Sequence, residues 1–238
     1  MNNNYIYIAN WKEYLSYQQA LLWCTQHAAD IKRLAQTASL VICPDYVALP
    51  PCHQLLGPDV FVGAQNCSAF GLGAHTGEVS AQSIKQAGAS YCILGHSERR
   101  TQAHETIEQV SKKIDPLLQH HITPIICLTD AYAIELPALL SAIRSATTDN
   151  PTKIIVAYEP VDAIGSGTAA SAATITTAVQ AIKKMISCHN HLDASVLYGG
   201  SVSSKNIHEL KKIACLDGFL IGRASTDFQE LKKIVELI

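Results

Sequence analysis

Residues 91–100 read Tyr-Cys-Ile-Leu-Gly-His-Ser-Glu-Arg-Arg, a short apolar run followed at once by polar residues. The run Tyr91–Leu94 is typical of a buried β-strand, and the polar residues after it are typical of a helix start or of an active-site loop. Similar apolar runs recur along the chain and alternate with longer amphipathic segments. This alternation predicts a parallel sheet that is covered by helices.

We expect strands at Tyr5–Ala9, Ser39–Cys43, Val60–Ala64, Tyr91–Leu94, Thr123–Cys127, Ile154–Tyr158, Ser195–Tyr198 and Gly218–Ile221. The segments between them predict helices, for example at Gln18–Ala35, His104–His120, Ala131–Ser145 and Ser171–Ser187. Ser203 and Ser204 are expected to cap a helix over Lys205–Lys212, and Gly88 to close the segment that begins near Ser80.

The spacing of the strands decides between two α/β architectures. Eight strands in 238 residues leave about 30 residues for each strand and its crossover helix. A doubly wound open sheet shares this alternation, but no glycine-rich dinucleotide fingerprint follows the first strand. The even spacing favours a closed (β/α)8 barrel, and no linker divides the chain. Residues 1–238 are therefore expected to form a single α/β domain.

Composition excludes several classes of function. The net charge of −2 offers no electrostatic basis for a nucleic-acid or membrane partner, and no apolar run approaches the roughly 20 residues of a membrane span. Met1–Asn4 lack the features of a signal peptide, so we expect a cytoplasmic protein. The eight cysteines never form C-x-x-C and favour reduced core thiols. His189 and His191 are expected in a solvated loop rather than at a metal site.

Polar residues follow five of the predicted strands, where a parallel barrel brings the strand ends to one face. These segments are Asn10-Trp11-Lys12, Gly95-His96-Ser97-Glu98-Arg99-Arg100, Glu159-Pro160 with residues 161–167, Gly199-Gly200-Ser201, and Gly222-Arg223-Ala224-Ser225.

The set is chemically coherent for moving a proton next to a carbonyl. A glutamate can remove the proton, while a histidine and a lysine can stabilise the charge on the oxygen of the enediolate. Glycines and serine after the last two strands expose main-chain N–H groups, which suit a phosphate dianion. The segment with Gly165-Ser166-Gly167 is typical of a lid that keeps water from the intermediate.

Taken together, the motifs resemble those of the triosephosphate isomerase family, in family order and across the whole chain. They are Asn-Trp-Lys at 10–12, Gly-Ala-Gln-Asn at 63–66, Thr-Gly-Glu at 76–78, Gly-His-Ser-Glu-Arg-Arg at 95–100, Tyr-Glu-Pro-Val-x-Ala-Ile-Gly-x-Gly at 158–167 and Tyr-Gly-Gly-Ser-Val at 198–202. The resemblance implies a TIM barrel, interconversion of dihydroxyacetone phosphate and D-glyceraldehyde 3-phosphate, and no cofactor or metal.

The resemblance also implies a role for each matched residue. Glu159 is implied to be the base, His96 a neutral electrophile, Lys12 the group that attracts the substrate's charge, and Asn10 a group that places its oxygen. The phosphate is implied to bind main-chain N–H groups of Gly165, Ser201, Gly222 and Arg223. The lid comprises Pro160, Val161, Asp162, Ala163, Ile164, Gly165, Ser166 and Gly167.

Two supporting residues and a loop complete the expectation. Glu98 is either part of the catalytic site or a buried structural carboxylate that serves Lys12 or a neighbouring loop, and both alternatives stay open. Cys127 is expected to be a packing residue. The loop at 73–78, which includes Thr76, resembles one that in the family enters a second subunit, so a homodimer is implied. His75 stands there in place of a usual aromatic residue.

The chain departs from the family pattern at three places. Asp162 replaces the usual tryptophan of the lid, Thr129-Asp130 replaces Gly-Glu, and Arg223 replaces a second glycine. We expect Arg223 to have a negative φ and to direct its guanidinium outward or to the rim. Asp162 and Asp130 are expected either to repel each other, if they lie close and ionised, or to separate into water.

Two other functions remain open on the residues. A paralogous barrel that isomerises a four-carbon ketose phosphate would need the same groups and a roomier pocket. A non-catalytic phosphate-binding barrel would be free to lose Glu159, His96 or Lys12, and all three are present.

Overall fold

The computed structural model describes residues 5–143, 151–163, 167–189 and 191–236. Parallel strands pair in chain order, and β8 pairs with β1 to close the barrel. The strands are β1 (Ile6–Asn10), β2 (Ser39–Cys43), β3 (Phe61–Ala64), β4 (Tyr91–Leu94), β5 (Thr123–Leu128), β6 (Thr152–Tyr158), β7 (Leu192–Tyr198) and β8 (Gly218–Ile221). The predicted (β/α)8 barrel is confirmed.

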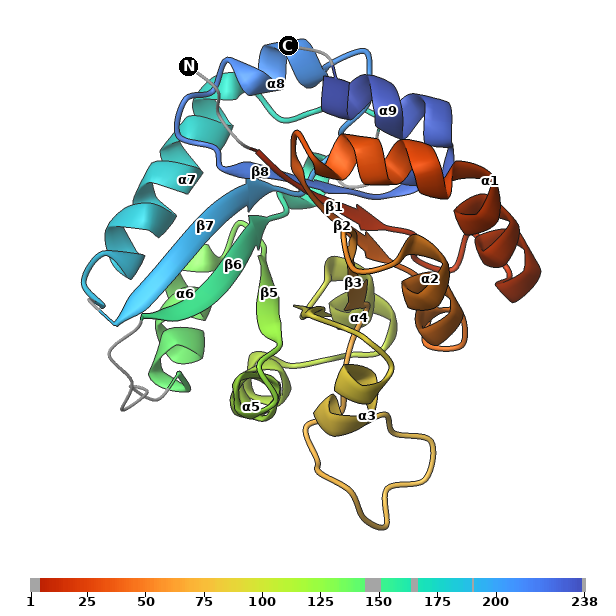
Figure 1. Ribbon diagram of the computed structural model, residues 1–238. Helices are drawn as coiled ribbons and strands as arrows, with labels where there is room; N and C mark the ends of the chain where they lie inside the picture. The colour runs from red at the N-terminus through yellow and green to blue at the C-terminus, as the bar shows by residue number, and fades with distance from the viewer. Residues whose placement is uncertain (1–4, 144–150, 164–166, 190, 237–238) are drawn as a thin grey trace.

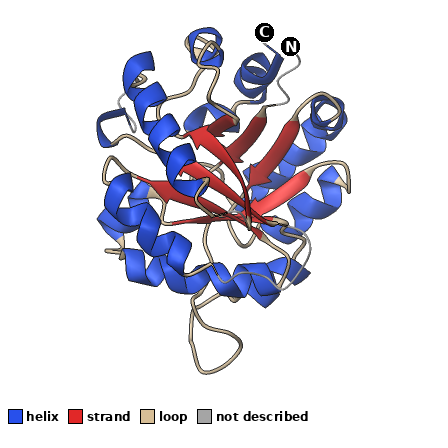
Figure 2. Ribbon diagram, turned by 90° about the vertical axis from the view of Figure 1, so that its left-hand side faces the viewer, coloured by secondary structure: helices blue, strands red, loops and turns tan. Residues whose placement is uncertain are grey.

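Helices surround the strands on the outside (Figures 1 and 2). They are α1 (Tyr17–Ala35), α2 (Leu49–Leu56), α3 (Ala81–Gln86), α4 (Ser97–Gln102), α5 (Ile107–Gln119), α6 (Tyr132–Ser141), α7 (Ala172–Ile186), α8 (Ile207–Lys211) and α9 (Phe228–Glu236), with 3-10 turns η1 (Val161–Ala163) and η2 (Arg223–Thr226). Ser16 and Thr106 begin α1 and α5 with capping boxes, in which Gln19 and Gln109 return the hydrogen bond.

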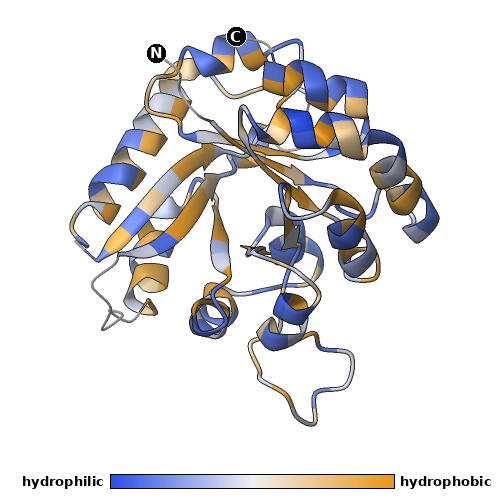
Figure 3. Cartoon of the chain, in the orientation of Figure 1, coloured by the Kyte–Doolittle hydropathy of each residue, from blue (hydrophilic) through white to orange (hydrophobic). Residues whose placement is uncertain are grey.

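The strands are buried on both faces. Residues that alternate along each strand pack either inside the barrel or between the strands and the helices. Ile8, Ile93 and Ile155 belong to a cluster that fills the barrel, whereas their neighbours Ala9 and Leu94 pack outward under the helices. Figure 3 shows the result as largely hydrophobic strands and helices with hydrophilic outer faces. Burial on both faces explains why the strands read as near-continuous apolar runs.

The strand predictions hold within three residues at each end, and the differences have local causes. α5 begins at Ile107 rather than His104, because His104 has a φ of 52° and interrupts the helix. Residues 144 and 145 of the helix predicted to end at Ser145 lie outside the described residues. Gly88, with a φ of 101°, follows α3, whose N-cap is Ser80, as predicted.

The predicted serine cap at 203–204 is wrong. The helix begins at Ile207, and its N-cap, Asn206, makes no side-chain capping bond. Ser204 instead uses both its N–H and its hydroxyl to bind the carboxylate of Glu230 in α9, at 2.7 and 2.9 Å. Ser204 therefore binds Glu230, which is distant in the sequence, instead of capping the helix that follows it.

All eight cysteines are free thiols, and six of them are buried, which confirms reduced core thiols. Within the described ranges, no group of three or more His, Cys, Asp or Glu side chains is arranged to hold a metal ion. In the same ranges, no helix has the length and apolar character needed to cross a membrane.

Candidate active site

The polar segments that follow the strands gather around one cavity at the carboxyl ends of the strands. The cavity measures about 350 Å³ and is lined by groups from β1, β4, β6, β7 and β8 and the loops after them. Its lining residues are Asn10, Lys12, Tyr14, His96, Glu159, Gly167, Gly199, Gly200, Ser201, Val202, Ser203, Leu220, Gly222, Arg223 and Ala224. The barrel thus brings together residues that lie more than 200 positions apart in the chain.

Glu159 lies at the end of β6 and is almost fully buried, with 1% of its surface exposed. One carboxylate oxygen lies 3.2 Å from Nε2 of His96, and the other accepts the main-chain N–H of Ser97 at 3.0 Å. Both partners belong to the start of α4, directly after β4. A buried carboxylate held between a histidine and a helix N-terminus is a candidate general base whose geometry is set by another strand.

The hydrogen bonds of His96 define its tautomer. Its Nδ1 accepts the main-chain N–H of Glu98 at 3.2 Å, so Nδ1 carries no proton. The neutral ring then carries its proton on Nε2, the nitrogen that faces Glu159 and the cavity. This arrangement leaves a single N–H donor for an oxygen in the cavity, as a neutral electrophile requires.

Lys12 adopts an uncommon backbone conformation, with a φ of 50°. The main chain is held by Asn10, whose Oδ1 accepts the N–H of Lys12 at 3.1 Å, and by Gln65, which donates to the Lys12 carbonyl at 2.8 Å. Its ammonium lies 2.7 Å from Oε1 of Glu98. The Glu98 side chain pairs with Lys12 but is 40% exposed, so the expectation of a buried structural carboxylate is wrong.

Glycines after β7 and β8 let the chain pass close to Glu159 and Lys12. A Cβ on Gly199 would lie 2.9 Å from Cγ of Glu159, and one on Gly222 would lie 3.3 Å from Cε of Lys12. A side chain at 199 would therefore displace the candidate base. The same loops contribute Ser201 and Arg223 to the cavity wall.

Arg223 follows the prediction made for it. Among the described residues other than glycine, Lys12, His104 and His121 have a positive φ, and the φ of Arg223 is not positive. The side chain is exposed, and the guanidinium lies 5.9 Å from the ring centre of Tyr14 at the rim of the cavity. The cavity therefore keeps its room despite the larger residue.

The described parts of the lid contact the loop after β7. The hydroxyl of Ser201 donates to the carbonyl of the lid residue Ala163 at 2.8 Å. Beyond the lid, the N–H of Ala170 donates to the hydroxyl of Tyr198, the last residue of β7, at 3.0 Å. The predicted lid residues Ile164, Gly165 and Ser166 lie outside the described residues, and so does the N–H of Gly165 that was assigned to phosphate.

Asp130 and Asp162 are both exposed, as in the second of the two alternatives considered for this pair. Asp130 accepts the hydroxyl of Tyr158 at 2.6 Å and the N–H of Val161 at 3.0 Å. Asp162 is exposed, and no hydrogen bond or ion pair joins it to another described residue. The Asp130 carboxylate thus accepts hydrogen bonds from two donors. The family resemblance did not reveal these two contacts.

Cys127 is buried inside the barrel beside Glu159. Burial, and then the charge of that carboxylate, raises the pKa of the Cys127 thiol well above its usual range. The thiol therefore remains protonated, as expected of a packing residue and not of a nucleophile.

Three supporting residues were missed at the level of sequence. Gln65 binds the carbonyl groups of Lys12 and Cys43, although it lies in a motif quoted above. Ser97 binds Glu159 through its main chain, which no side-chain pattern can reveal. Arg100 binds the carbonyl groups of Gly95 and Cys127 at 2.6 and 2.7 Å and so ties the ends of β4 and β5 together.

The predicted dimer loop projects from the barrel before α3 (Figure 1). Thr76 is exposed, as are Phe70 and Leu72 at 53% and 71%. His75 stacks on Phe70 with ring centres 4.3 Å apart, so it packs within its own loop.

Comparison with known proteins agrees with the geometry of the site. The family profile of triosephosphate isomerase matches residues 5–238. The protein named triosephosphate isomerase from Thermoanaerobacter sp. strain X514 is 32% identical to this chain, and the alignment covers 97% of this chain and 98% of that protein. The protein of the same name from Wolbachia sp. subsp. Brugia malayi is 34% identical, with coverage of 99% and 98%. The protein of that name from Thermus thermophilus is 34% identical over 96% of both chains. The chain therefore belongs to the triosephosphate isomerase family.

Proposed function

We propose that this chain interconverts dihydroxyacetone phosphate and D-glyceraldehyde 3-phosphate, with Glu159 as the base. The observation that carries the proposal is the buried contact between Glu159 and His96 on one wall of a cavity that also holds Lys12 and two glycine loops. These groups match the charges that develop when a proton leaves carbon next to a carbonyl.

In the proposed reaction, the carbonyl oxygen of the substrate takes the place of Glu159 at the Nε2–H of His96. Glu159 turns to the neighbouring carbon and removes a proton, and the C–H electron pair forms the C=C bond of the enediolate. His96 and Lys12 stabilise the negative oxygen. The protonated Glu159 then returns the proton to the other carbon, while the hydroxyl proton passes from the oxygen on the first carbon to the enediolate oxygen, so no atom is gained or lost.

The phosphate group would lie at the loops after β7 and β8. Main-chain N–H groups at Ser201, Gly222 and Arg223, together with that of Gly165, are proposed to bind it. The ammonium of Lys12 lies on the same side, close to Gly222, and adds a positive charge that Glu98 only partly offsets. Inorganic phosphate should therefore compete with substrate.

A coupled assay on the purified protein tests the proposal. We expect turnover of the three-carbon substrates without added metal or cofactor, and much weaker turnover of a four-carbon ketose phosphate, because the relatives that the chain resembles are named triosephosphate isomerase. Higher kcat/KM on the four-carbon substrate would assign the chain to the alternative isomerase. Phosphate binding without turnover of either would favour a binding protein.

We further propose a homodimer in which the loop at 73–78 reaches the partner's site. A second cavity of about 190 Å³ shares Asn10, Lys12 and His96 with the first and leaves that side of the site open to a partner loop. The exposed Phe70 and Leu72 give the loop an apolar surface to bury. Sedimentation at assay concentration should find a dimer, and a fully active monomer would exclude this role of the loop.

A cytoplasmic location is also part of the proposal. Eight unpaired thiols, six of them buried, suit a reducing compartment better than an oxidising one. Fractionation of the source cells would test it.

A further inference from the structure

Asp130 makes two contacts that bracket the candidate base. It follows β5, and its two oxygens accept from residues on either side of Glu159-Pro160. Oδ1 accepts the Tyr158 hydroxyl at 2.6 Å, and Oδ2 accepts the main-chain N–H of Val161 at 3.0 Å. Because Pro160 has no N–H, Val161 carries the first amide hydrogen after the base. One carboxylate therefore ties both sides of Glu159 to the neighbouring strand.

Both ends of this contact are themselves held in place. Tyr158 is buried at 1% exposure, and its ring meets that of Tyr132 edge-on with centres 6.0 Å apart. Burial, and then the hydrogen bond to Asp130, raises the pKa of Tyr158, so its hydroxyl remains a donor.

The segment that carries Asp130 is braced in turn. Thr129 donates its N–H and its hydroxyl to the carboxylate of Glu135, both at 3.1 Å. Glu135 is itself paired with Arg100 at 2.6 Å, and Arg100 holds the carbonyl groups of Gly95 and Cys127. Asp130 is thus presented from a loop that is fixed to the ends of β4 and β5.

The contact with the lid runs through the main chain and not through a lid side chain. The next residue, Asp162, is exposed and makes no hydrogen bond or ion pair within the described ranges. We propose that Asp130 is a positioning residue that fixes the main chain at Val161, and with it Glu159, independently of the side chain at 162. Only the kinetic consequence of this inference rests on the proposed function.

Amide hydrogen exchange at Val161 tests the contact directly, and it needs no turnover. In Asp130→Ala the N–H loses a charged acceptor, so we expect exchange at Val161 to become about tenfold faster. Asp162→Ala is the matched control, because it removes the same kind of side chain and charge three residues after the base; exchange at Val161 should then stay as in the parent protein. Equal effects of the two variants, or no effect of Asp130→Ala, would overturn the inference.

Kinetics give the second measurement. Asp130→Ala should lower kcat by about tenfold, while the inhibition constant of inorganic phosphate changes less than about twofold, because the phosphate loops are untouched. An equal loss in kcat and in phosphate affinity would show general damage to the site and would contradict a positioning role.

A third variant keeps the test decisive if Asp130→Ala does not fold. In Asp130→Asn a neutral amide oxygen replaces the carboxylate and is a weaker acceptor. Exchange at Val161 should then still rise several-fold, and an unchanged rate would refute the contact. Should the protein bind phosphate but fail to isomerise trioses, the exchange result would still decide the structural claim separately from the proposed activity.

Discussion

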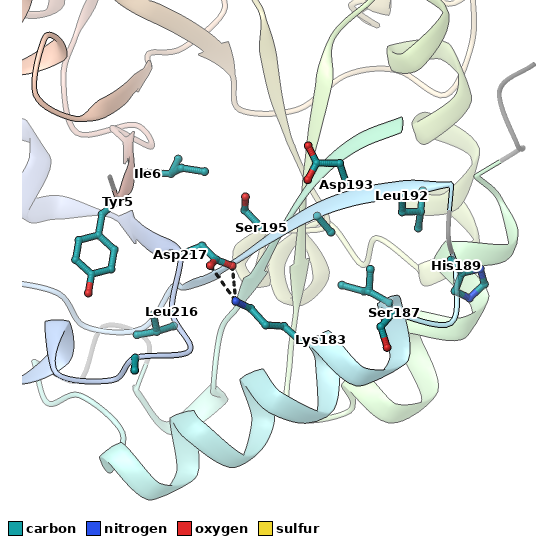
Figure 4. Close-up of a pocket in the computed structure, with 13 residues that line it drawn as sticks. Tyr5, Ile6, Lys183, Ser187, His189, Leu192, Asp193, Ser195, Leu216 and Asp217 are labelled. Carbon is teal, nitrogen blue, oxygen red and sulfur yellow. Dashed lines mark hydrogen bonds and ion pairs between the residues drawn. The ribbon is translucent and has the colours of Figure 1, made fainter. Parts of the chain in front are cut away.

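The two ends of the barrel are both hollow, yet they differ in how their polar groups are held. At the amino ends of β7 and β8 lies an open hollow of about 790 Å³, more than twice the volume of the candidate active site (Figure 4). Its charged centre is the pair formed by Lys183 and Asp217 at 2.8 Å, whose side chains are 37% and 34% exposed. In the smaller cavity, the side chains of Glu159 and His96 are 2% and 9% exposed.

This difference shows that volume is a poor guide to function, whereas converging desolvated groups are a good one. Asp217 also accepts the N–H of Val196 at 2.7 Å, so its contacts join β7 to the start of β8 and stabilise the barrel. Glu159 and His96 instead contact each other on the wall of the smaller cavity. Groups that stabilise the fold at one end and candidate reactive groups at the other are the division expected of a (β/α)8 barrel.

The largest effect should come from Glu159→Gln. The amide has nearly the same shape but cannot take a proton, so kcat should fall by about 10⁴-fold, with a much smaller change in KM. Steady-state kinetics on glyceraldehyde 3-phosphate would measure it, and binding of inorganic phosphate should be retained as the control. Near-native kcat would remove Glu159 from the role of base.

His96→Asn should follow, with a loss of about 10²–10³-fold in kcat. Asparagine can still offer an N–H donor. Its shorter side chain cannot accept the N–H of Glu98, as Nδ1 of His96 does, and also place a donor where Nε2 lies beside Glu159. The same assay measures it, together with a thermal melt to show that α4 still forms. A loss confined to KM would mean that His96 binds substrate without acting on the transition state.

Arg223→Leu should have a modest effect. Because the guanidinium lies at the rim over Tyr14 and the main chain is expected to bind phosphate, KM should change less than about fivefold and kcat should be unchanged. Raising the salt concentration should reduce even this difference. A much larger rise in KM would show that the side chain itself holds the phosphate.

Lys183→Met should have the smallest effect and would sharpen the contrast between the two ends. The ion pair is more than a third exposed on the lysine side, so solvent screening should limit its loss to less than about 1 kcal/mol in the free energy of unfolding. Chemical denaturation would measure this, and kcat and KM should match the parent protein. Lost activity in a stable variant would mean that the larger hollow takes part in function.

The chain's local patterns determined the barrel and the identity of its main reactive groups. Apolar runs such as Tyr91–Leu94 are buried on both faces whatever their partners are, so they are recognisable without the tertiary structure. Glu159, His96 and Lys12 follow strands in motifs that resemble a family, and parallel strands bring their carboxyl ends to one face. These inferences need only the order and spacing of residues along the chain.

Only the tertiary structure decided which partner each polar group takes. Ser204 binds Glu230 instead of capping a helix, and Asp130 binds Tyr158 and the main chain of Val161 instead of opposing Asp162. Hydrogen bonds are short and directional, and their partners here lie 26 to 31 positions away. The sequence specifies which donors and acceptors exist, but distances of about 3 Å between them arise only when the strands and helices pack.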